Sequence, residues 1–225
     1  MDLQVNQVTS IEPSYSEGEL QLAAFGMGCF WGPEALFGHL PGVIKTCVGY
    51  AGGTAPNPTY RQMGDHTETV QLVFNPGRIT FEEVLDMFWN SHNPFNINDY
   101  KGQQYKSLLF YSDERQKDTI QHVLKKRKEQ GKGEPSTEIV PSAPFTLAED
   151  KHQKYYLKRF PDAIEKLSIL YQTEADLRNS TLAARLNGLA KGYTNLERIS
   201  QEVSQWPIEQ NNKQFLIDLI KKIRW

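Results

Sequence analysis

Cysteine is scarce in this 225-residue chain, which also has no long apolar run and almost no excess of charge. The two cysteines, Cys29 and Cys47, are too few for a disulfide-stapled scaffold, and their spacing fits neither a CxxC redox pair nor a zinc site. No apolar stretch approaches the roughly 20 residues that a membrane helix needs. The formal net charge of −2 gives no reason to expect a nucleic-acid or membrane partner.

The N-terminal residues lack the basic segment and the apolar run of a secretion signal. We therefore expect a cytoplasmic protein, because a reducing compartment keeps thiols available for chemistry. The hydrophobic content of 39% is that of an ordinary globular protein, and the length suits one domain with an appendage or two small domains. A monomer is the default expectation.

The order of the expected elements indicates the fold class. Periodicity, caps and turn residues predict, in chain order, a strand at 20–27, a short helix from Pro33, strands at 43–53 and 69–74, a helix at 80–92, a strand at 107–111, a long helix capped by Asp113 and a strand at 137–140. The first six elements match the split βαβ, or ferredoxin-like, pattern of an α+β protein. A doubly wound fold is less favoured because no helix separates the second strand from the third.

Composition divides the chain into three parts. Residues 1–18 are polar and are expected to form a flexible lead-in. Residues 19–160 contain the expected α+β domain. Residues 161–225 have helical patterns, no expected strand and no cysteine, and so predict a C-terminal helical extension.

Cys29 stands in the stretch FGMGCFWGPEALF, where the first expected strand passes into the first helix. Backbone N–H groups at a helix start favour a thiolate. Gly28 and Gly32 leave room for a substrate, and Phe30 and Trp31 offer an apolar wall beside the sulfur. The alternative is a buried and unreactive cysteine, and local chemistry alone leaves both interpretations open.

The segment GCFWGPE resembles the active-site signature of the peptide methionine sulfoxide reductase A (MsrA) family. Six later segments are similar to further blocks of that family, in the same order: VGYAGG, NPTY, HTE, FWNSHNP, GQQYKS and AEDKHQKYY. The resemblance covers about residues 20–160. It implies an enzyme that reduces the S epimer of methionine sulfoxide, free or in proteins, to methionine, without a metal or a bound cofactor.

The resemblance also implies catalytic roles. Cys29 corresponds to the nucleophile, Glu68 to the acid, and Tyr60 and Tyr105 to the tyrosines that contact the sulfoxide oxygen. A sulfoxide sulfur is electrophilic, but its oxygen leaves poorly unless it is protonated and hydrogen-bonded. A thiolate, an acid with a neutral form favoured by an apolar wall, and hydroxyl donors together meet those needs.

Substrate binding is implied for Phe30, Trp31 and Asp99. The two aromatic residues would hold the S-methyl group, since sulfur and methyl contacts with rings are favourable. Asp99 would hold the substrate or a tyrosine. The sequence departs from the family here, because Tyr100 and Lys101 are inserted between Asp99 and the glycine of the next block.

Recycling of the enzyme raises a second question. Attack by Cys29 leaves a sulfenic acid, which must be reduced again. Many relatives use a cysteine in a C-terminal tail and then thioredoxin, but this tail contains no cysteine. Either Cys47 resolves the sulfenic acid, or an external thiol such as thioredoxin attacks it directly.

Two other function classes use the same residues. A thiol peroxidase would also need an activated Cys29, but it would not explain an aromatic methyl slot together with Glu68, Tyr60 and Tyr105. A binding or sensor module for oxidised methionine would not need that catalytic set either. The glycines of GYAGG fit neither a dinucleotide fingerprint nor a phosphate-binding loop.

Overall fold

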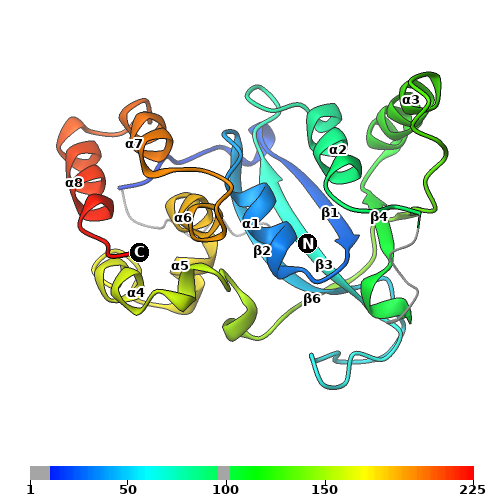
Figure 1. Ribbon diagram of the computed structural model, residues 1–225, viewed down its shortest axis with the longest axis horizontal. Helices are drawn as coiled ribbons and strands as arrows, with labels where there is room; N and C mark the ends of the chain where they lie inside the picture. Colours follow the sequence, from blue (N-terminus) through cyan, green and yellow to red (C-terminus); the bar gives the residue numbers. More distant parts are fainter. Residues whose placement is uncertain (1–10, 96–101) are drawn as a thin grey trace.

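The computed structural model describes residues 11–95 and 102–225. They form an α+β unit with one six-stranded sheet, and a group of helices lies beside it (Figure 1). The strands are β1 (Gln21–Met27), β2 (Val43–Ala51), β3 (Thr67–Phe74), β4 (Ser107–Tyr111), β5 (Glu138–Pro141) and β6 (Phe145–Leu147). Their order in the sheet is β5-β4-β1-β3-β2-β6. The central order β4-β1-β3-β2, antiparallel throughout, confirms the ferredoxin-like core.

Three helices cover one face of this sheet: α1 (Trp31–Gly38), α2 (Phe81–Asn90) and α3 (Glu114–Glu129). Their apolar side chains join those of alternate strand residues in the main core, including Phe25, Phe37, Val70, Phe88 and Ile120. The expected caps are confirmed. Thr80 and Glu83 form a capping box at α2, and the Asp113 carboxylate accepts the Gln116 amide at the start of α3.

Two strands differ from the sequence prediction. The third strand begins at Thr67 rather than at residue 69, which places Glu68 inside the sheet. The short edge strand β6 was not predicted, because three residues are too few for a periodic pattern. It pairs with β2 through Gly49, Tyr50 and Ala51, and the segment that follows it continues beside the middle of β2, where the Ala148 amide donates to the Val48 carbonyl at 3.0 Å.

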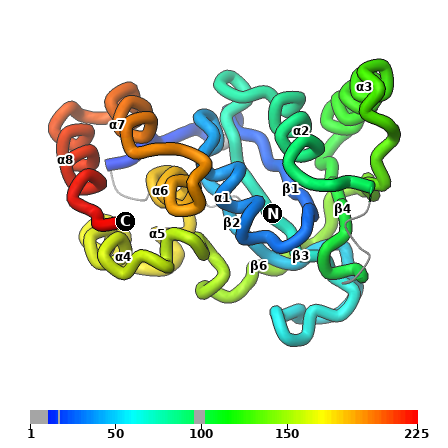
Figure 2. Tube along the Cα trace, in the orientation of Figure 1, coloured from blue at the N-terminus to red at the C-terminus, as the bar shows by residue number. Residues whose placement is uncertain are grey.

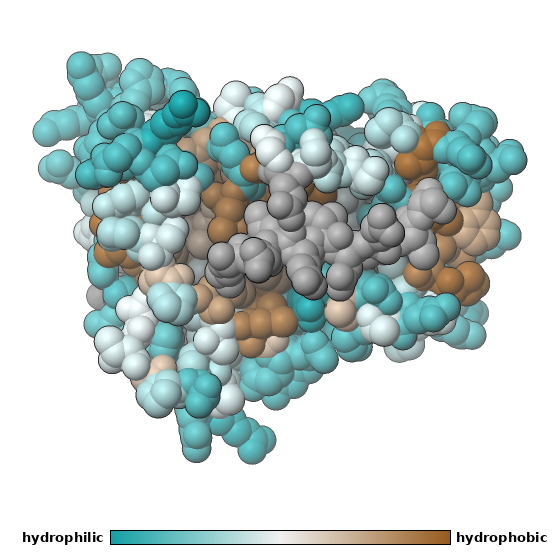
Figure 3. All heavy atoms as spheres, turned by 180° about the vertical axis from the view of Figure 1, so that it is seen from behind, coloured by the Kyte–Doolittle hydropathy of each residue, from teal (hydrophilic) through white to brown (hydrophobic). Residues whose placement is uncertain are grey.

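The other face of the sheet carries a smaller apolar cluster. Ala51, Leu108 and Phe110 are buried there, and Val140 and Phe145 pack against them. Figure 3 shows this reverse side, where brown apolar atoms lie beside the atoms drawn in grey.

The C-terminal extension contains five helices: α4 (Pro161–Leu167), α5 (Glu174–Asn179), α6 (Thr181–Lys191), α7 (Leu196–Ser204) and α8 (Gln210–Lys221). They have their own apolar core, which also takes in Leu157 and Ile11 from outside the expected 161–225 segment. In the tube view they occupy one end of the molecule, from yellow to red, next to α1 and β2 (Figure 2). No helix among the described residues is long and apolar enough to cross a membrane.

Helix α6 joins the extension to helix α1, which follows Cys29, by close packing. A Cβ placed on Gly38 would lie 2.8 Å from the Ala184 carbonyl oxygen, and one placed on Gly188 would lie 2.5 Å from the His39 Cβ. Glycine at these two positions lets the helix backbones approach. The extension is therefore packed directly on α1.

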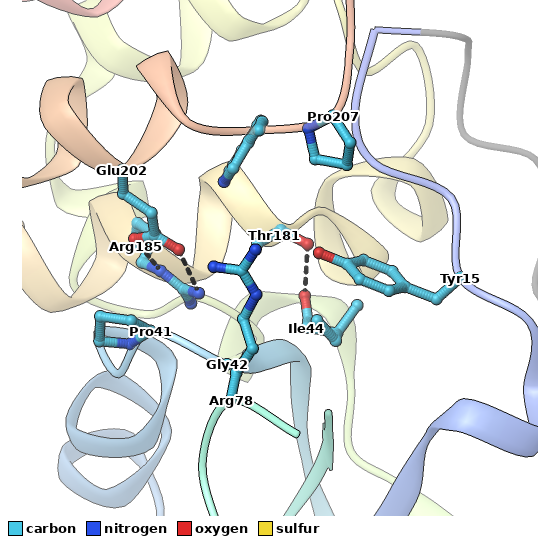
Figure 4. A pocket seen from close by; sticks show the side chains of 10 residues that line it. Tyr15, Pro41, Gly42, Ile44, Arg78, Thr181, Arg185, Glu202 and Pro207 are labelled. Carbon is cyan, nitrogen blue, oxygen red and sulfur yellow. Dashed lines mark hydrogen bonds and ion pairs between the residues drawn. The ribbon is translucent and has the colours of Figure 1, made fainter. Parts of the chain in front are cut away.

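Polar groups around a small pocket strengthen the contact between α6 and the sheet domain (Figure 4). The buried Arg185 of α6 forms a bidentate ion pair with Glu202 of α7 and donates to the carbonyls of Gly38 and Val43. The Thr181 hydroxyl donates to a carbonyl of β2 at 2.7 Å. A bidentate pair of this kind is a strong interaction, and its geometry also fixes the orientation of α6 relative to α7.

The described part of the expected lead-in is bound to the extension. The Glu12 carboxylate is buried and accepts hydrogen bonds from the Tyr171 hydroxyl, from the Ser180 hydroxyl at 2.6 Å and from the Thr181 amide at 2.8 Å. A carboxylate at the start of α6 also complements the helix dipole. Residues around Glu12 thus lie on the helices at the opposite end of the chain.

Candidate active site

Cys29 lies on the short turn between β1 and α1. Gly28 has a φ of +89°, a conformation that favours glycine, and the turn leaves Cys29 exposed to solvent. Desolvation of the sulfur raises the pKa of the Cys29 thiol most, and the charge of Glu68 raises it further. The Trp31 amide at the start of α1 opposes both effects. The helix start therefore favours the thiolate, as predicted, but it does not dominate in the free protein.

Glu68 projects from β3 toward this turn and is only 1% exposed. One carboxylate oxygen accepts the Phe30 amide at 3.0 Å, and the other accepts the Gln104 side-chain amide at 2.8 Å. Burial raises the pKa of the Glu68 carboxyl, while the two hydrogen bonds lower it and so limit the rise. The group can consequently hold or release a proton beside Cys29.

Tyr60 reaches the same place from the loop between β2 and β3. Desolvation raises the pKa of the Tyr60 hydroxyl, and the charges of Glu68 and Cys29 raise it further, so the three groups lie within electrostatic reach. Glu149 fixes this loop to the sheet. Its carboxylate accepts the Tyr60 amide at 3.3 Å and the Tyr50 hydroxyl at 2.7 Å.

The remainder of the Tyr60 loop is held by two polar side chains. The Asp65 carboxylate accepts the amides of Thr54 and Ala55, and these hydrogen bonds keep the pKa of Asp65 well below its usual range. The His66 ring accepts the Gly53 amide at 3.2 Å and donates to the Ala55 carbonyl at 2.8 Å. Both ring nitrogens of His66 are therefore used to hold the loop.

Phe30 and Trp31 form the expected aromatic wall, and His152 and Tyr155 support it. Phe30 is buried, whereas Trp31 is half-buried and stacks on Tyr155 with ring centroids 3.7 Å apart. The Trp31 indole donates to the His152 ring at 3.2 Å. The His152 ring also contacts the rings of Phe30 and Tyr60 at centroid distances of 5.5 and 4.7 Å. His152 therefore lies at the centre of the aromatic residues of the site.

The supporting residues come from two segments that are similar in sequence to blocks of the family. His152 and Tyr155 belong to AEDKHQKYY, and Gln104 belongs to GQQYKS. Their partners Glu68 and Trp31 lie 36 to 124 residues away in the chain, so no local pattern could indicate the contacts. Only the similarity of the two segments to family blocks pointed to them.

The structure places the other expected site residues as follows. Tyr105 is half-buried and ends the single turn η2 (Gly102–Tyr105), directly after Gln104. The turn is fixed to β3, because the Thr67 hydroxyl donates to the Gln103 carbonyl at 2.8 Å. Asp99 lies outside the described residues.

Cys47 lies on the opposite face of the sheet from this site. In β2 the neighbouring Val48 and the later Tyr50 point into the main core, and strand alternation directs Cys47 the other way. Its sulfur lies 3.9 Å from the Gln71 side chain, and burial raises the pKa of the Cys47 thiol to about 11. The structure does not bring Cys47 to Cys29.

No group of three or more histidine, cysteine, aspartate or glutamate side chains suited to a metal ion occurs within residues 11–95 and 102–225. The functional groups that do converge are an exposed thiol, a buried carboxyl, a tyrosine hydroxyl and an aromatic wall. They define a site for cysteine-dependent chemistry at one end of a ferredoxin-like sheet.

Comparisons with known proteins identify the family. A family model described as peptide methionine sulfoxide reductase matches residues 21–183. The chain is 40% identical to a peptide methionine sulfoxide reductase of Drosophila melanogaster over 195 residues, which cover 86% of this chain and 77% of the relative. It is 39% identical to peptide methionine sulfoxide reductase A5 of Oryza sativa subsp. japonica over 202 residues, covering 84% and 78%. The chain belongs to the peptide methionine sulfoxide reductase family.

A solved structure agrees with this assignment. Methionine sulfoxide reductase A of Corynebacterium diphtheriae superposes with a TM-score of 0.55 at 33% identity, covering 65% of this chain and 78% of that one. The fly and rice matches cover more of this chain than the α+β unit alone contains, so they include part of the helical extension.

Proposed function

We propose that this protein reduces the S epimer of methionine sulfoxide, free or in proteins, to methionine. The observation that carries the proposal is the pairing of Cys29 with Glu68, in which a buried carboxyl lies within electrostatic reach of an exposed thiol. The aromatic wall of Phe30 and Trp31 beside this pair fits an S-methyl group.

The reaction transfers one oxygen atom and two electrons. The Cys29 thiolate attacks the sulfoxide sulfur while Glu68 delivers a proton to the sulfoxide oxygen. The sulfur–oxygen bond of the substrate then breaks, the oxygen passes to the Cys29 sulfur as a sulfenic acid, and methionine leaves. The substrate is thereby reduced, Cys29 is oxidised, and the proton ends on the sulfenic oxygen.

Tyr60 and Tyr105 are proposed to donate hydrogen bonds to the sulfoxide oxygen as negative charge develops on it. The raised pKa of Tyr60 keeps this hydroxyl protonated and able to donate. The expected contribution of Asp99 to substrate binding remains part of the same proposal.

An external thiol, such as thioredoxin, is proposed to reduce the Cys29 sulfenic acid. Cys29 is exposed to an incoming thiol, whereas Cys47 lies on the other sheet face with its thiol protonated at neutral pH. Such recycling suits a monomer in the reducing cytoplasm.

A single turnover without added reductant tests the proposal. Reduced protein is mixed with the S epimer of a methionine sulfoxide peptide, and methionine and free thiols are counted. One methionine and the loss of one thiol per chain are expected, with no product from the R epimer or from Cys29→Ser. Loss of both thiols would instead implicate Cys47, and faster consumption of hydrogen peroxide than of sulfoxide would favour a thiol peroxidase.

A further inference from the structure

Gln104 lies in the single turn η2 and reaches across to the carboxyl of Glu68. Its side-chain amide donates to one Glu68 oxygen at 2.8 Å, and the Phe30 amide donates to the other at 3.0 Å. Each carboxylate oxygen thus has one N–H donor. An amide N–H is a donor to the ionised carboxylate, so both contacts favour the charged form of Glu68.

The position of Gln104 is set by the backbone of its own turn. The Thr67 hydroxyl binds the Gln103 carbonyl at 2.8 Å, and Thr67 precedes Glu68 in β3. On the other side of the turn, Lys106 forms an ion pair with Glu138 of β5 at 2.6 Å. The turn is therefore attached to strands on both sides, and the Gln104 amide is directed at Glu68 before any substrate binds.

The two reacting groups compete for a proton. A charged Glu68 raises the pKa of the Cys29 thiol, so the two negative forms disfavour each other. With a single proton in the pair, either the thiol or the carboxyl holds it, and the two groups titrate together. Any contact that favours the Glu68 carboxylate moves that proton to the Cys29 sulfur.

We infer that Gln104 is a positioning residue that holds Glu68 as a carboxylate in the free enzyme, so that Cys29 keeps its proton until a sulfoxide arrives. The inference rests on the proposed function for the later step, in which the proton moves from the Cys29 sulfur to Glu68 and then to the sulfoxide oxygen. In the resting enzyme it has a separate consequence. A protonated Cys29 reacts slowly with adventitious oxidants and alkylating agents, because the thiolate is the nucleophile.

The reaction of Cys29 with iodoacetamide tests the inference without any reductase assay. Peptide mass measurement gives the alkylation rate at Cys29 alone, from pH 5 to 10. In Gln104→Met, which keeps the chain length and removes the donor, the rate at neutral pH is expected to rise about tenfold to 100-fold, as for loss of one hydrogen bond to a charged group. Gln104→Leu also removes the donor and should raise the rate by a similar factor.

Gln103→Met is the matched control, because the Gln103 side chain is exposed and has no hydrogen bond within the described residues. It should alkylate at the wild-type rate. For active variants, the acid limb of the kcat/KM profile should move toward neutral pH in Gln104→Met and not in Gln103→Met.

Wild-type alkylation profiles in both Gln104→Met and Gln104→Leu would overturn the inference. If Gln104→Met does not fold by circular dichroism, the Gln104→Leu profile decides. A failure of the proposed function is distinguishable, because the alkylation rates of the variants and the wild type can be compared without any sulfoxide. The comparison therefore tests the inference even if the wild-type protein does not reduce sulfoxides.

Discussion

The Glu68 carboxylate accepts the main-chain amide of Phe30 at 3.0 Å, which joins the strand β3 to the turn that carries Cys29. An acid that is hydrogen-bonded to the residue after the nucleophile cannot move away from it without breaking a buried hydrogen bond. The hydrogen bond thereby holds the Glu68 carboxyl beside the turn that carries Cys29. Such fixed placement is what proton transfer during attack requires.

Glu68→Gln should separate acid catalysis from thiol reactivity. Loss of the proton donor is expected to lower kcat/KM for sulfoxide reduction by about 100-fold or more. Alkylation of Cys29 by iodoacetamide at neutral pH should become faster, because the neutral amide no longer raises the pKa of the thiol. A variant with near-wild-type reductase activity would show that Glu68 is not the acid.

The pH dependence of kcat/KM is expected to be bell-shaped, because the pair of Cys29 and Glu68 must hold one proton in total. Activity should fall at low pH as Glu68 is protonated beside a neutral thiol, and at high pH as both groups lose their protons. Burial raises the pKa of both groups, so both limbs should lie above the ordinary pKa values of a carboxyl and a thiol. Steady-state rates over pH 4 to 11 with a saturating reductant check this, and limbs at the ordinary values would contradict it.

The sequence predicted the order of the core elements because each one carries its own local pattern. The alternation of residues 69–74 and the capping box of Thr80 and Glu83 depend only on neighbours, and both are present in the structure. The strand β6 and the attachment of Glu12 to the extension were not predicted. They depend on contacts with residues far away in the chain, which no local pattern records.

The residue types of the candidate site were predictable from the sequence, but the direction of the pKa shift of the Cys29 thiol was not. The helix start beside Cys29 correctly indicated a contribution that favours the thiolate. Burial and the charge of Glu68 outweigh it, and neither can be inferred from the sequence around Cys29. The support of Trp31 by Tyr155 and His152 was likewise hidden, since it joins residues more than 120 positions apart.

Tyr155→Ala should weaken substrate binding more than it slows the chemical step. The Tyr155 ring stacks on Trp31 at 3.7 Å and nearly parallel, so its removal leaves one face of the indole without support. An aromatic pair contributes about 0.5–1.5 kcal/mol, which corresponds to a rise in KM of about threefold to tenfold. Tyr155→Phe keeps the ring and should retain the wild-type KM. A fall in kcat with an unchanged KM would contradict the role given to the stack.

Lys154→Met should destabilise the protein strongly. Lys154 and Glu34 are both fully buried and lie 2.7 Å apart, so the variant leaves a carboxylate without its charge partner. The expected loss of unfolding free energy is about 3–5 kcal/mol. Adding Glu34→Gln should recover a large part of this lost free energy, because no unpaired carboxylate then remains. As a control, Lys117→Met removes an exposed ion pair with Glu114 and should change the free energy of unfolding by less than about 1 kcal/mol. Urea unfolding of the wild type, Lys154→Met, Glu34→Gln and the double variant completes the cycle, and additive effects of the two buried changes would contradict the coupling.

Gly188→Ala tests whether the helical extension and helix α1, which follows Cys29, form one cooperative unit. The new methyl group would lie 2.5 Å from the His39 Cβ and 3.0 Å from the Ala35 carbonyl oxygen, so α6 must move away from α1. We expect a loss of about 1–3 kcal/mol of unfolding free energy from this overpacking, although alanine is the better helix former. Gly18→Ala, with no atom within 4 Å of the new methyl group, is the control. Because α1 begins two residues after Cys29, a shift of α6 that is transmitted through α1 should also lower the sulfoxide reduction rate, whereas a loss confined to the extension would leave that rate unchanged.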